Sequence, residues 1–311
     1  MTSSHLRPLR LGTRASALAL TQSGHIAERI RTECGVPVEL VTISTEGDRS
    51  SAPLASMGGQ GVFVAALREA LVRGDVDIAV HSLKDLPTTP DPRLTLAAIP
   101  RREDARDVLV ARDGLTLGEL PRGARVGTGS PRREAQLNAL GLGVEVVPIR
   151  GNDTRIGKIA SGDYDGVLLA RAGLLRLGRA DEATEVIDPL QMLPAPGQGA
   201  LACECRADDD STARLLERLD DSDTRAAVTA ERSLLATLEA GCSAPVGALA
   251  EIADGDDGEV LWLRAVVGDI SGSPTIRLSA TGLPSEAAAV GERLAVEMLA
   301  EGADALVAVA S

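Results

Sequence analysis

The sequence repeats one pattern twice, and this repetition constrains the fold more than any other feature. In the first stretch, short apolar runs at 9–13, 38–45 and 76–81 alternate with segments of helical periodicity at 16–34 and 61–73. Strands that alternate with helices usually pair in parallel. This order therefore predicts an α/β unit built on a mostly parallel sheet.

The same alternation restarts further along the chain. Strand-like runs are expected at 125–128, 144–149 and 166–170, and helices at 132–140 and 154–161. Two similar α/β units are therefore expected to follow one another.

Proline-rich joints bracket the second unit. "AAIPRRED" (97–104) precedes it and "LPAPGQGA" (193–200) follows it, and both are typical of crossovers between domains. After the second joint, "ALACECR" (200–206) predicts a strand that can rejoin the first sheet. The predicted boundaries are 1–100 with 199–220 for domain 1, 101–198 for domain 2 and 221–311 for domain 3.

The pattern changes in the last part of the chain. A helix at 223–240 leads into three strand-like runs at 246–252, 260–270 and 275–281, and a helix at 285–300 follows. This order predicts a small α+β domain with an antiparallel sheet. The acidic "ADGDDGE" between the first two runs fits a solvated hairpin loop, because it lacks the ligand spacing of a calcium loop.

Composition excludes several classes of function. A net charge of −13 disfavours binding to nucleic acid or to an anionic membrane. No apolar run reaches about 18 residues and no apolar stretch follows the first arginines, so we expect no membrane span, no signal peptide and a cytoplasmic location. Within this acidic chain, residues 122–179 hold 10 basic against 5 acidic side chains. Only Lys84 and Lys158 are lysines, a bias that a high-GC genome can produce and that also suits bidentate binding of carboxylates.

The cysteines do not form a disulfide or metal pattern. Cys34, Cys203, Cys205 and Cys242 are too few and too scattered for either, and the first three fit small packing residues. Cys242 differs, because a glycine precedes it and a Ser-Ala-Pro loop follows, so that its thiol can be exposed. The residues alone leave open a nucleophile, a redox sensor or no role.

The strand ends carry most of the candidate ligand contacts. Two α/β domains joined by two crossovers form a cleft, and ligands of such folds bind beyond the carboxyl ends of the strands. Most of these ends carry a basic residue near a helix N-terminus, where anions are favoured. This predicts a site for a multiply negative ligand, with candidate contacts from Arg14, Arg132, Arg133, Arg150, Arg155 and Arg176.

"HSLKDLP" (81–87) places four polar residues at the end of an apolar strand. Asp85 is either a plain turn residue or, beside cations at a cleft, an ionised carboxylate that stabilises a cationic intermediate or relays a proton. Lys84 is expected to contact an anion, since a neighbouring carboxylate disfavours the neutral amine that a Schiff base needs. His81 is expected to be structural.

Together these stretches resemble the porphobilinogen deaminase family over nearly the whole chain. The matching segments, in the family's order, are "LRLGTRASALALTQ", "GGQGVFVAAL", "DIAVHSLKDLPT", "REDARDVLV", "VGTGSPRREAQL", "IRGNDTR", "GVLLARAGLLRLG", "APGQGALACECR" and "LEAGCSAPVG". The resemblance implies an α/β fold of two type II periplasmic-binding-protein-like domains around a cleft, plus a small C-terminal α+β domain with a three-stranded antiparallel sheet. It also implies a dipyrromethane cofactor, one per chain, bound through a thioether to Cys242.

The resemblance further implies a transferase of tetrapyrrole and heme biosynthesis. In the family, four porphobilinogen molecules condense head to tail, each losing ammonia to give an electrophilic azafulvene, and hydrolysis releases hydroxymethylbilane. Asp85 matches the family's catalytic aspartate. The matches to carboxylate-binding positions are Arg14, Ser16, Lys84, Ser130, Arg132, Arg133, Arg150, Arg155 and Arg176, and possible further cleft residues are Gln22, Ser82 and Gln198.

Three departures from the family pattern concern neither Asp85 nor Cys242. Gln60 stands where the family often has lysine, Glu46 reverses the charge of another lysine, and "RGNDTR" is one residue shorter than the common form. We expect these changes to alter affinity before activity.

Two other classes of function remain as alternatives. A pure anion-binding protein would use the same cleft without needing Asp85 or Cys242, and would leave the third domain unexplained. A cysteine-dependent acyl transferase would need a histidine base, and the three histidines lie far from Cys242 in the sequence. The resemblance to the family also implies a monomer that needs no metal and that passes its product to uroporphyrinogen-III synthase.

Overall fold

The computed structural model describes residues 7–43, 61–149, 156–157, 159, 161–241, 244–256 and 258–308. The chain forms two compact units, one of Met1–Arg102 with Ala200–Arg225 and one of Glu103–Gly199 with Ala226–Ser311. Both are discontinuous in sequence, as the two proline-rich joints suggest. The exact boundaries of the three domains expected from the sequence stay a prediction.

The first unit is built on a five-stranded mixed sheet with the order β2-β1-β3-β10-β4. Its strands are β1 (Leu9–Thr13), β2 (Val38–Thr42), β3 (Ile78–Ser82), β4 (Leu94–Ala98) and β10 (Leu201–Arg206). β1 pairs in parallel with β2 and β3, whereas β10 lies antiparallel between β3 and β4. The prediction that "ALACECR" rejoins the first sheet is therefore confirmed.

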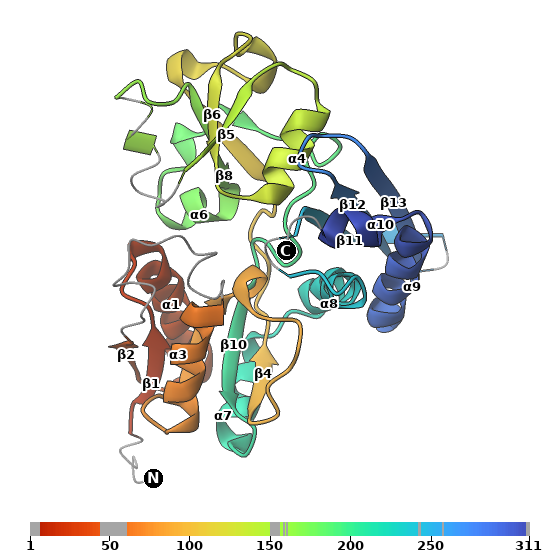
Figure 1. Ribbon diagram of the computed structural model, residues 1–311. Helices are drawn as coiled ribbons and strands as arrows, with labels where there is room; N and C mark the ends of the chain where they lie inside the picture. The colour runs from red at the N-terminus through yellow and green to blue at the C-terminus, as the bar shows by residue number, and fades with distance from the viewer. Residues whose placement is uncertain are drawn as a thin grey trace. The chain divides into compact units, whose positions relative to one another are not determined.

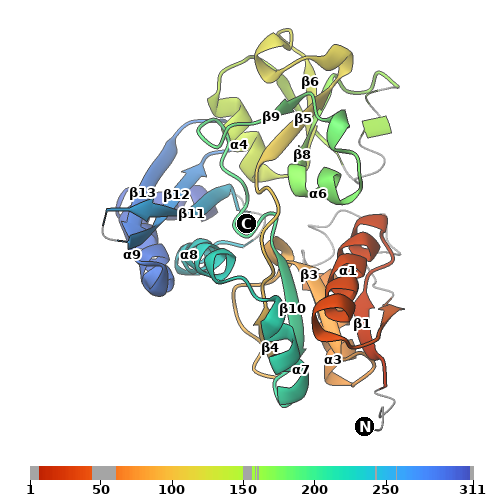
Figure 2. The ribbon, with the colours of Figure 1, turned by 180° about the vertical axis from the view of Figure 1, so that it is seen from behind.

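Helices cover both faces of this sheet (Figures 1 and 2). α1 (Ala17–Arg29) and α7 (Asp210–Leu216) bury apolar side chains against one face, in a core that includes Leu11, Ile78 and both cysteines of β10. α3 (Gly61–Val72) packs on the other face. The expected role of these two cysteines as packing residues is confirmed by their complete burial, which raises their pKa to about 12 for Cys203 and about 11 for Cys205.

The second unit contains a sheet with the corresponding order, β7-β6-β8-β5-β9. Its strands are β5 (Asp107–Ala111), β6 (Arg125–Thr128), β7 (Glu145–Pro148), β8 (Gly166–Ala170) and β9 (Glu185–Val186). β6 pairs in parallel with β7 and β8, and β5 lies antiparallel between β8 and β9. α4 (Pro131–Ala139) contributes to the core on one face, and α6 (Arg171–Arg176) to the core on the other.

A three-stranded antiparallel sheet follows in the second unit, as predicted. β11 (Val246–Gly255), β12 (Gly258–Gly268) and β13 (Thr275–Gly282) form a meander. The described residues of the acidic segment lie mostly in the paired ends of β11 and β12. α8 (Ser222–Thr237), α9 (Ala287–Ala300) and α10 (Ala303–Ala308) bury apolar side chains against this sheet. The C-terminal part therefore has the expected α+β character.

Several predicted bounds shift. The helix expected at 16–34 ends as α1 at Arg29 and continues as one π-helical turn, Ile30–Cys34, which Gly35 closes with a left-handed φ of 70°. The strand expected at 76–81 is β3, which begins two residues later, at Ile78, and ends one residue later, at Ser82. Most of the helix expected at 154–161 lies outside the described residues.

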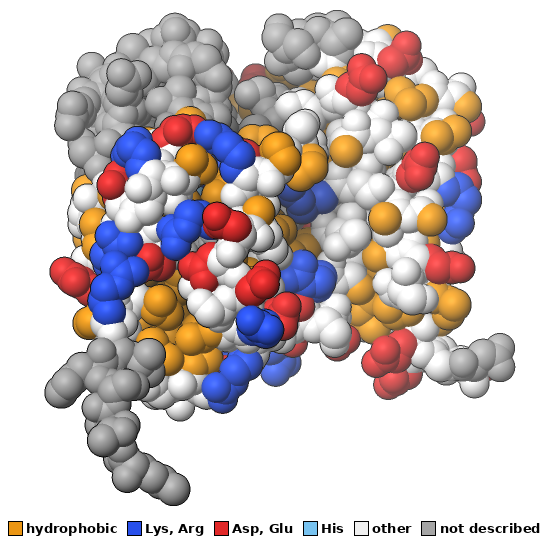
Figure 3. Space-filling view, turned by 90° about the horizontal axis from the view of Figure 1, so that it is seen from below, with side chains coloured by type: hydrophobic (Ala, Val, Ile, Leu, Met, Phe, Trp, Pro, Cys, Tyr) orange, Lys and Arg blue, Asp and Glu red, His pale blue; other side chains and the backbone are white. Residues whose placement is uncertain are grey.

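Charged side chains are mixed on the face of the molecule seen in Figure 3, where arginine and lysine side chains lie beside aspartate and glutamate side chains. Exposed ion pairs such as Arg29–Glu33 and Arg93–Glu69 show this mixing at the level of single contacts. The described side chains of this face form no continuous basic surface of the kind that nucleic acid attracts.

The contact between α8 and α9 yields a first prediction. A Cβ on Gly291 of α9 would overlap the carbonyl oxygen of Ala230 on α8. We expect Gly291→Ala to lower the free energy of unfolding by about 1–3 kcal/mol, because the two helices must separate. In the control Gly24→Ala on α1, the new Cβ meets nothing within 4 Å, so stability should rise by up to about 1 kcal/mol. Urea unfolding checks both, and equal effects would contradict the packing argument.

Candidate functional site

The first group of predicted residues lies at the carboxyl edge of the first sheet. β1, β2 and β3 run in parallel, so their carboxyl ends share this edge. Ser16 begins α1, and its hydroxyl accepts a hydrogen bond of 3.3 Å from the Ala19 amide. Gln22, one turn into the same helix, is buried, and its amide lies 3.3 Å from the Ser82 hydroxyl at the end of β3. The structure thus brings Gln22 and Ser82 together.

Asp85 ends a short 3₁₀ turn, Leu83–Asp85, that directly follows β3. Burial raises the pKa of this carboxyl, and the opposing charges of Lys84, Arg14 and His81 only partly reverse the rise. The predicted cations at Arg14 and Lys84 therefore lie near enough to Asp85 for their charges to act on its pKa. A carboxyl with a raised pKa among cations is suited to holding and returning a proton or to stabilising positive charge.

Behind this turn lies a buried charge network that the sequence analysis did not find. Glu204 on β10 accepts hydrogen bonds of 3.0 and 2.7 Å from Arg68 of α3, and its Oε2 lies 3.2 Å from Nε2 of His81. Burial would raise the pKa of Glu204, but His81 and Arg68 outweigh it and the pKa lies below its usual range. A glutamate between two cysteines in a strand that is mostly apolar could have signalled such a partner. The expected structural role of His81 agrees with these contacts.

The second group of predicted residues lies around α4. Ser130 is the residue before this helix and Pro131 is its first residue, one position earlier than the expected start at 132, and the Ser130 side chain makes no capping hydrogen bond. Arg132 and Arg133 follow, and their side chains are only 4% and 7% exposed. Both guanidinium groups pair with Asp107, at 2.7 and 2.8 Å. Sequence reasoning missed Asp107, although it lies in the segment "REDARDVLV".

Gln198 lies next to the same carboxylate. Its side-chain amide nitrogen donates to the Ala105 carbonyl at 2.7 Å and to Asp107 at 2.8 Å. The side chain is 1% exposed, so it contributes to the interior of the second unit at this point.

Arg176 ends α6 and is partly buried. It donates one hydrogen bond of 2.6 Å to the Gly199 carbonyl, and burial lowers its pKa while the charge of Glu103 acts against this. Among the described residues it forms no ion pair with a carboxylate. A desolvated guanidinium that lacks a paired carboxylate is suited to an anionic ligand.

Three predicted site residues lie outside the described residues: Cys242, Arg150 and Arg155. The departures at Gln60 and Glu46 lie outside them as well. In the described part of the chain, no group of three or more His, Cys, Asp or Glu side chains is placed to hold a metal ion. None of the described helices is both long and apolar enough to cross a membrane.

Fold and site together define a class of protein. Two sheets of matching order, each with one antiparallel strand supplied across a crossover, are the type II periplasmic-binding-protein-like fold, here combined with buried arginines and a C-terminal α+β part. Solved structures similar to this chain include an ancestral cationic amino acid solute-binding protein, with a TM-score of 0.45 and 17% identity over 68% of this chain and 87% of that one. Another is immunogenic lipoprotein A from Vibrio vulnificus, with a TM-score of 0.44 and 12% identity over 70% and 96%.

Comparison of sequences gives the family. Residues 9–214 match the model described as porphobilinogen deaminase, dipyromethane cofactor binding domain, and residues 225–300 match the model of the porphobilinogen deaminase C-terminal domain. Porphobilinogen deaminase 1 of Streptomyces coelicolor is 60% identical over 310 residues, covering 96% of this chain and 97% of the relative. Porphobilinogen deaminase of Mycobacterium tuberculosis is 59% identical over 301 residues, covering 95% and 97%. The chain belongs to the porphobilinogen deaminase family.

Family membership confirms the predicted class of enzyme, a transferase of tetrapyrrole biosynthesis that condenses four porphobilinogen molecules into hydroxymethylbilane. It also confirms the predicted dipyrromethane cofactor. The individual roles of the site residues stay predictions.

Proposed function

We propose that Asp85 is the catalytic residue of this chain and that Cys242 carries the dipyrromethane. The observation that carries the assignment of Asp85 is its position at the carboxyl edge of the first sheet, where burial raises its pKa and the charges of Lys84, Arg14 and His81 act on it. Such a carboxylate can hydrogen-bond pyrrole N–H groups and stabilise positive charge while ammonia leaves and the next ring is added.

The residues present fit the cofactor and the substrate, both of which carry carboxylates. When bound, the dipyrromethane supplies the pyrrole carbon to which each porphobilinogen is joined. The buried Nε atoms of Arg132 and Arg133 have no hydrogen-bond partner among the described residues. Arg176 likewise pairs with no described carboxylate. These donors are where ligand carboxylates would be held.

The remaining predicted contacts complete this assignment. We assign ligand carboxylates to the side chains with suitable donors at the two strand edges: Arg14, Ser16, Lys84, Ser130, Arg132, Arg133, Arg150, Arg155 and Arg176. Gln22 and Ser82 support the first edge through their mutual contact, and Gln198 supports the second through Asp107. We further propose a cytoplasmic monomer that uses no metal and passes its product to uroporphyrinogen-III synthase.

The intact mass of the denatured protein tests the attachment. We expect the wild-type chain to exceed the mass of its polypeptide by two linked pyrrole units, and Cys242→Ser to match the bare polypeptide. Cys34→Ser is the control, since this cysteine is partly buried and its thiol contacts the Leu215 carbonyl at 3.6 Å. That variant should keep the added mass. A wild-type chain of bare mass that porphobilinogen does not change would instead favour a pure anion-binding protein.

A further inference from the structure

The contacts around Asp107 form a buried cluster with unequal charges. Asp107 begins β5 and is wholly buried. Its Oδ2 accepts a hydrogen bond of 2.7 Å from NH1 of Arg132, and its Oδ1 accepts one of 2.8 Å from NH2 of Arg133. Gln198 donates a further hydrogen bond of 2.8 Å to Oδ1. One carboxylate therefore organises two guanidinium groups.

Backbone carbonyls fix the two guanidinium groups from other sides. Arg132 donates to the Leu193 carbonyl at 2.6 Å, and Arg133 donates to the Leu168 carbonyl of β8 at 2.9 Å. Since these acceptors belong to different segments of the second unit, neither arginine can turn without losing a buried hydrogen bond.

The cluster lacks one negative charge. Two guanidinium groups carry two positive charges, and Asp107 is the one carboxylate that pairs with them in the described part of the chain. The Nε–H groups of both arginines are also buried, and no described residue accepts a hydrogen bond from them. Buried charges and buried donors are costly unless they are paired, so the cluster is poised to accept one further anion.

We propose that Asp107 is a positioning residue for ligand binding: it sets Arg132 and Arg133 side by side and leaves a net charge that one carboxylate of the substrate or cofactor neutralises. This inference rests on the proposed function, because it takes the two arginines as ligand contacts. It adds that their geometry depends on a residue that touches no ligand.

The charge of Asp107 is permanent at working pH. Burial alone would raise its pKa, but Arg132 and Arg133 outweigh this effect and hold the pKa far below the usual carboxyl range. The pH profile of turnover should therefore contain no step from Asp107, and its role must be tested by substitution.

Asp107→Glu separates positioning from simple charge balance, since it keeps the charge and lengthens the side chain by one methylene. We expect a folded protein whose KM for porphobilinogen rises about 10-fold or more, because a displacement of about 1 Å is costly in a fixed site. We also expect fewer chains to carry the dipyrromethane mass after incubation with porphobilinogen. If Asp107→Glu instead restores wild-type KM and cofactor content, charge balance alone is sufficient and the proposal is wrong.

If Asp107→Glu does not fold, the Gln198→Met variant tests whether Asp107 is a positioning residue. This variant removes the hydrogen bond to Oδ1 while keeping an apolar side chain of similar length in a site that is 1% exposed. The proposal requires KM to rise at least about threefold, in keeping with the loss of one hydrogen bond to a charged group. An unchanged KM in the folded variant would overturn it.

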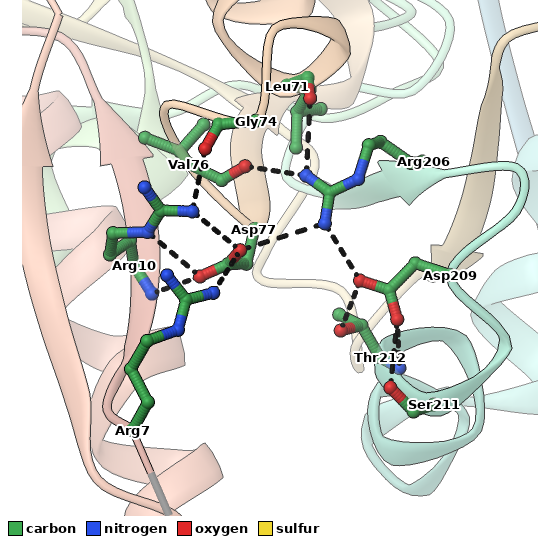
Figure 4. Close-up of polar contacts among 10 residues, drawn as sticks. All are labelled: Arg7, Arg10, Leu71, Gly74, Val76, Asp77, Arg206, Asp209, Ser211 and Thr212. Atoms are coloured by element: carbon green, nitrogen blue, oxygen red, sulfur yellow. Dashed lines mark hydrogen bonds and ion pairs between the residues drawn. The ribbon is translucent and has the colours of Figure 1, made fainter.

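A second aspartate provides the matched control. Asp77, at the amino end of β3, is also buried and pairs with Arg10 and Arg7 at 2.9 Å, as Figure 4 shows. Arg206 lies 3.7 Å away. Asp77 is at the opposite end of β3 from the turn that holds Asp85. We expect Asp77→Glu to lose stability without a change in KM or cofactor content.

The controls distinguish the ways in which the inference can fail. If KM rises in proportion to the loss of stability, and does so equally in the Asp77 and Asp107 variants, Asp107 forms a structural ion pair and is not a positioning residue. If the wild-type chain itself gains no mass from porphobilinogen, the proposed function fails. If the wild-type chain gains the dipyrromethane mass and the Asp107→Glu variant has the same KM and cofactor content, the inference about Asp107 is wrong and the proposed function still stands.

Discussion

Asp85→Asn should lower kcat by about 10²–10³-fold, the range seen when a group that stabilises transition-state charge is removed. The asparagine side chain keeps the size of aspartate but carries no charge, so it cannot balance the positive charge that develops as ammonia leaves. Stopped assays of hydroxymethylbilane formation measure this loss. Asp91→Asn is the control, because this partly buried carboxylate pairs with Arg93 and its pKa is lowered to about 2. It should leave kcat unchanged.

The same variant should be more stable than the wild type. The pKa of Asp85 is raised in the folded chain, so the ionised carboxylate opposes folding at pH values above both its unfolded and its folded pKa. Asparagine removes this cost, and thermal unfolding at pH 7 should show a higher Tm. A stable variant with full turnover would exclude Asp85 from catalysis.

The pH dependence of kcat in the wild-type enzyme follows from the raised pKa of Asp85. If the ionised form is the active one, activity is lost as the pH falls through the raised pKa. The acid limb of the kcat profile should then lie above the ordinary aspartate value of about 3.9. A limb at or below that value would contradict the assignment.

Arg176→Met should raise KM by at least about 30-fold, because removing one partner of a desolvated charge pair costs about 2 kcal/mol or more. The methionine keeps much of the apolar side-chain volume and removes the guanidinium. Stability should change much less than affinity, since burial lowers the pKa of Arg176 and its charge is therefore a cost to the folded chain without ligand.

Arg171→Met on the same helix is the matched control. Arg171 is 30% exposed and pairs with Asp104 at 3.0 Å, so its contribution to stability should be about 1 kcal/mol or less. We expect the Arg171→Met variant to have the KM of the wild type. Equal increases in KM for both variants would indicate that any arginine lost from α6 disturbs the helix, and Arg176 would lose its assigned role.

The sequence predicted the parts of the fold that have strong local patterns. β1 and β8 begin and end at the predicted residues. β8 shows the reason most clearly, because a strand buried on both faces is apolar along its length. β9 has two residues and α6 has six, too few for a period to be visible. β5 begins with Asp107, a charged residue that nothing local marks as buried.

The sequence could supply candidate residues for the site but not their pairings. Asp85 is a candidate because four polar residues end an apolar strand, and Arg132 and Arg133 are candidates because they follow a glycine-containing turn. Asp107 pairs with arginines that lie 25 and 26 positions away. Glu204 pairs with Arg68 across 136 positions. Such contacts depend on which strands become neighbours, and a single sequence does not contain that information in any local pattern.

The placement of β10 has a consequence for synthesis of the chain on the ribosome. β10 lies between β3 and β4, so neither has its neighbour until residues 201–206 have emerged. The nascent chain must therefore carry two unpaired strand edges while the whole of Glu103–Gly199 is being translated. A ribosome that stalls within that stretch would release a first unit without the strand that joins β3 to β4, and this product would be a substrate for chaperones and proteases.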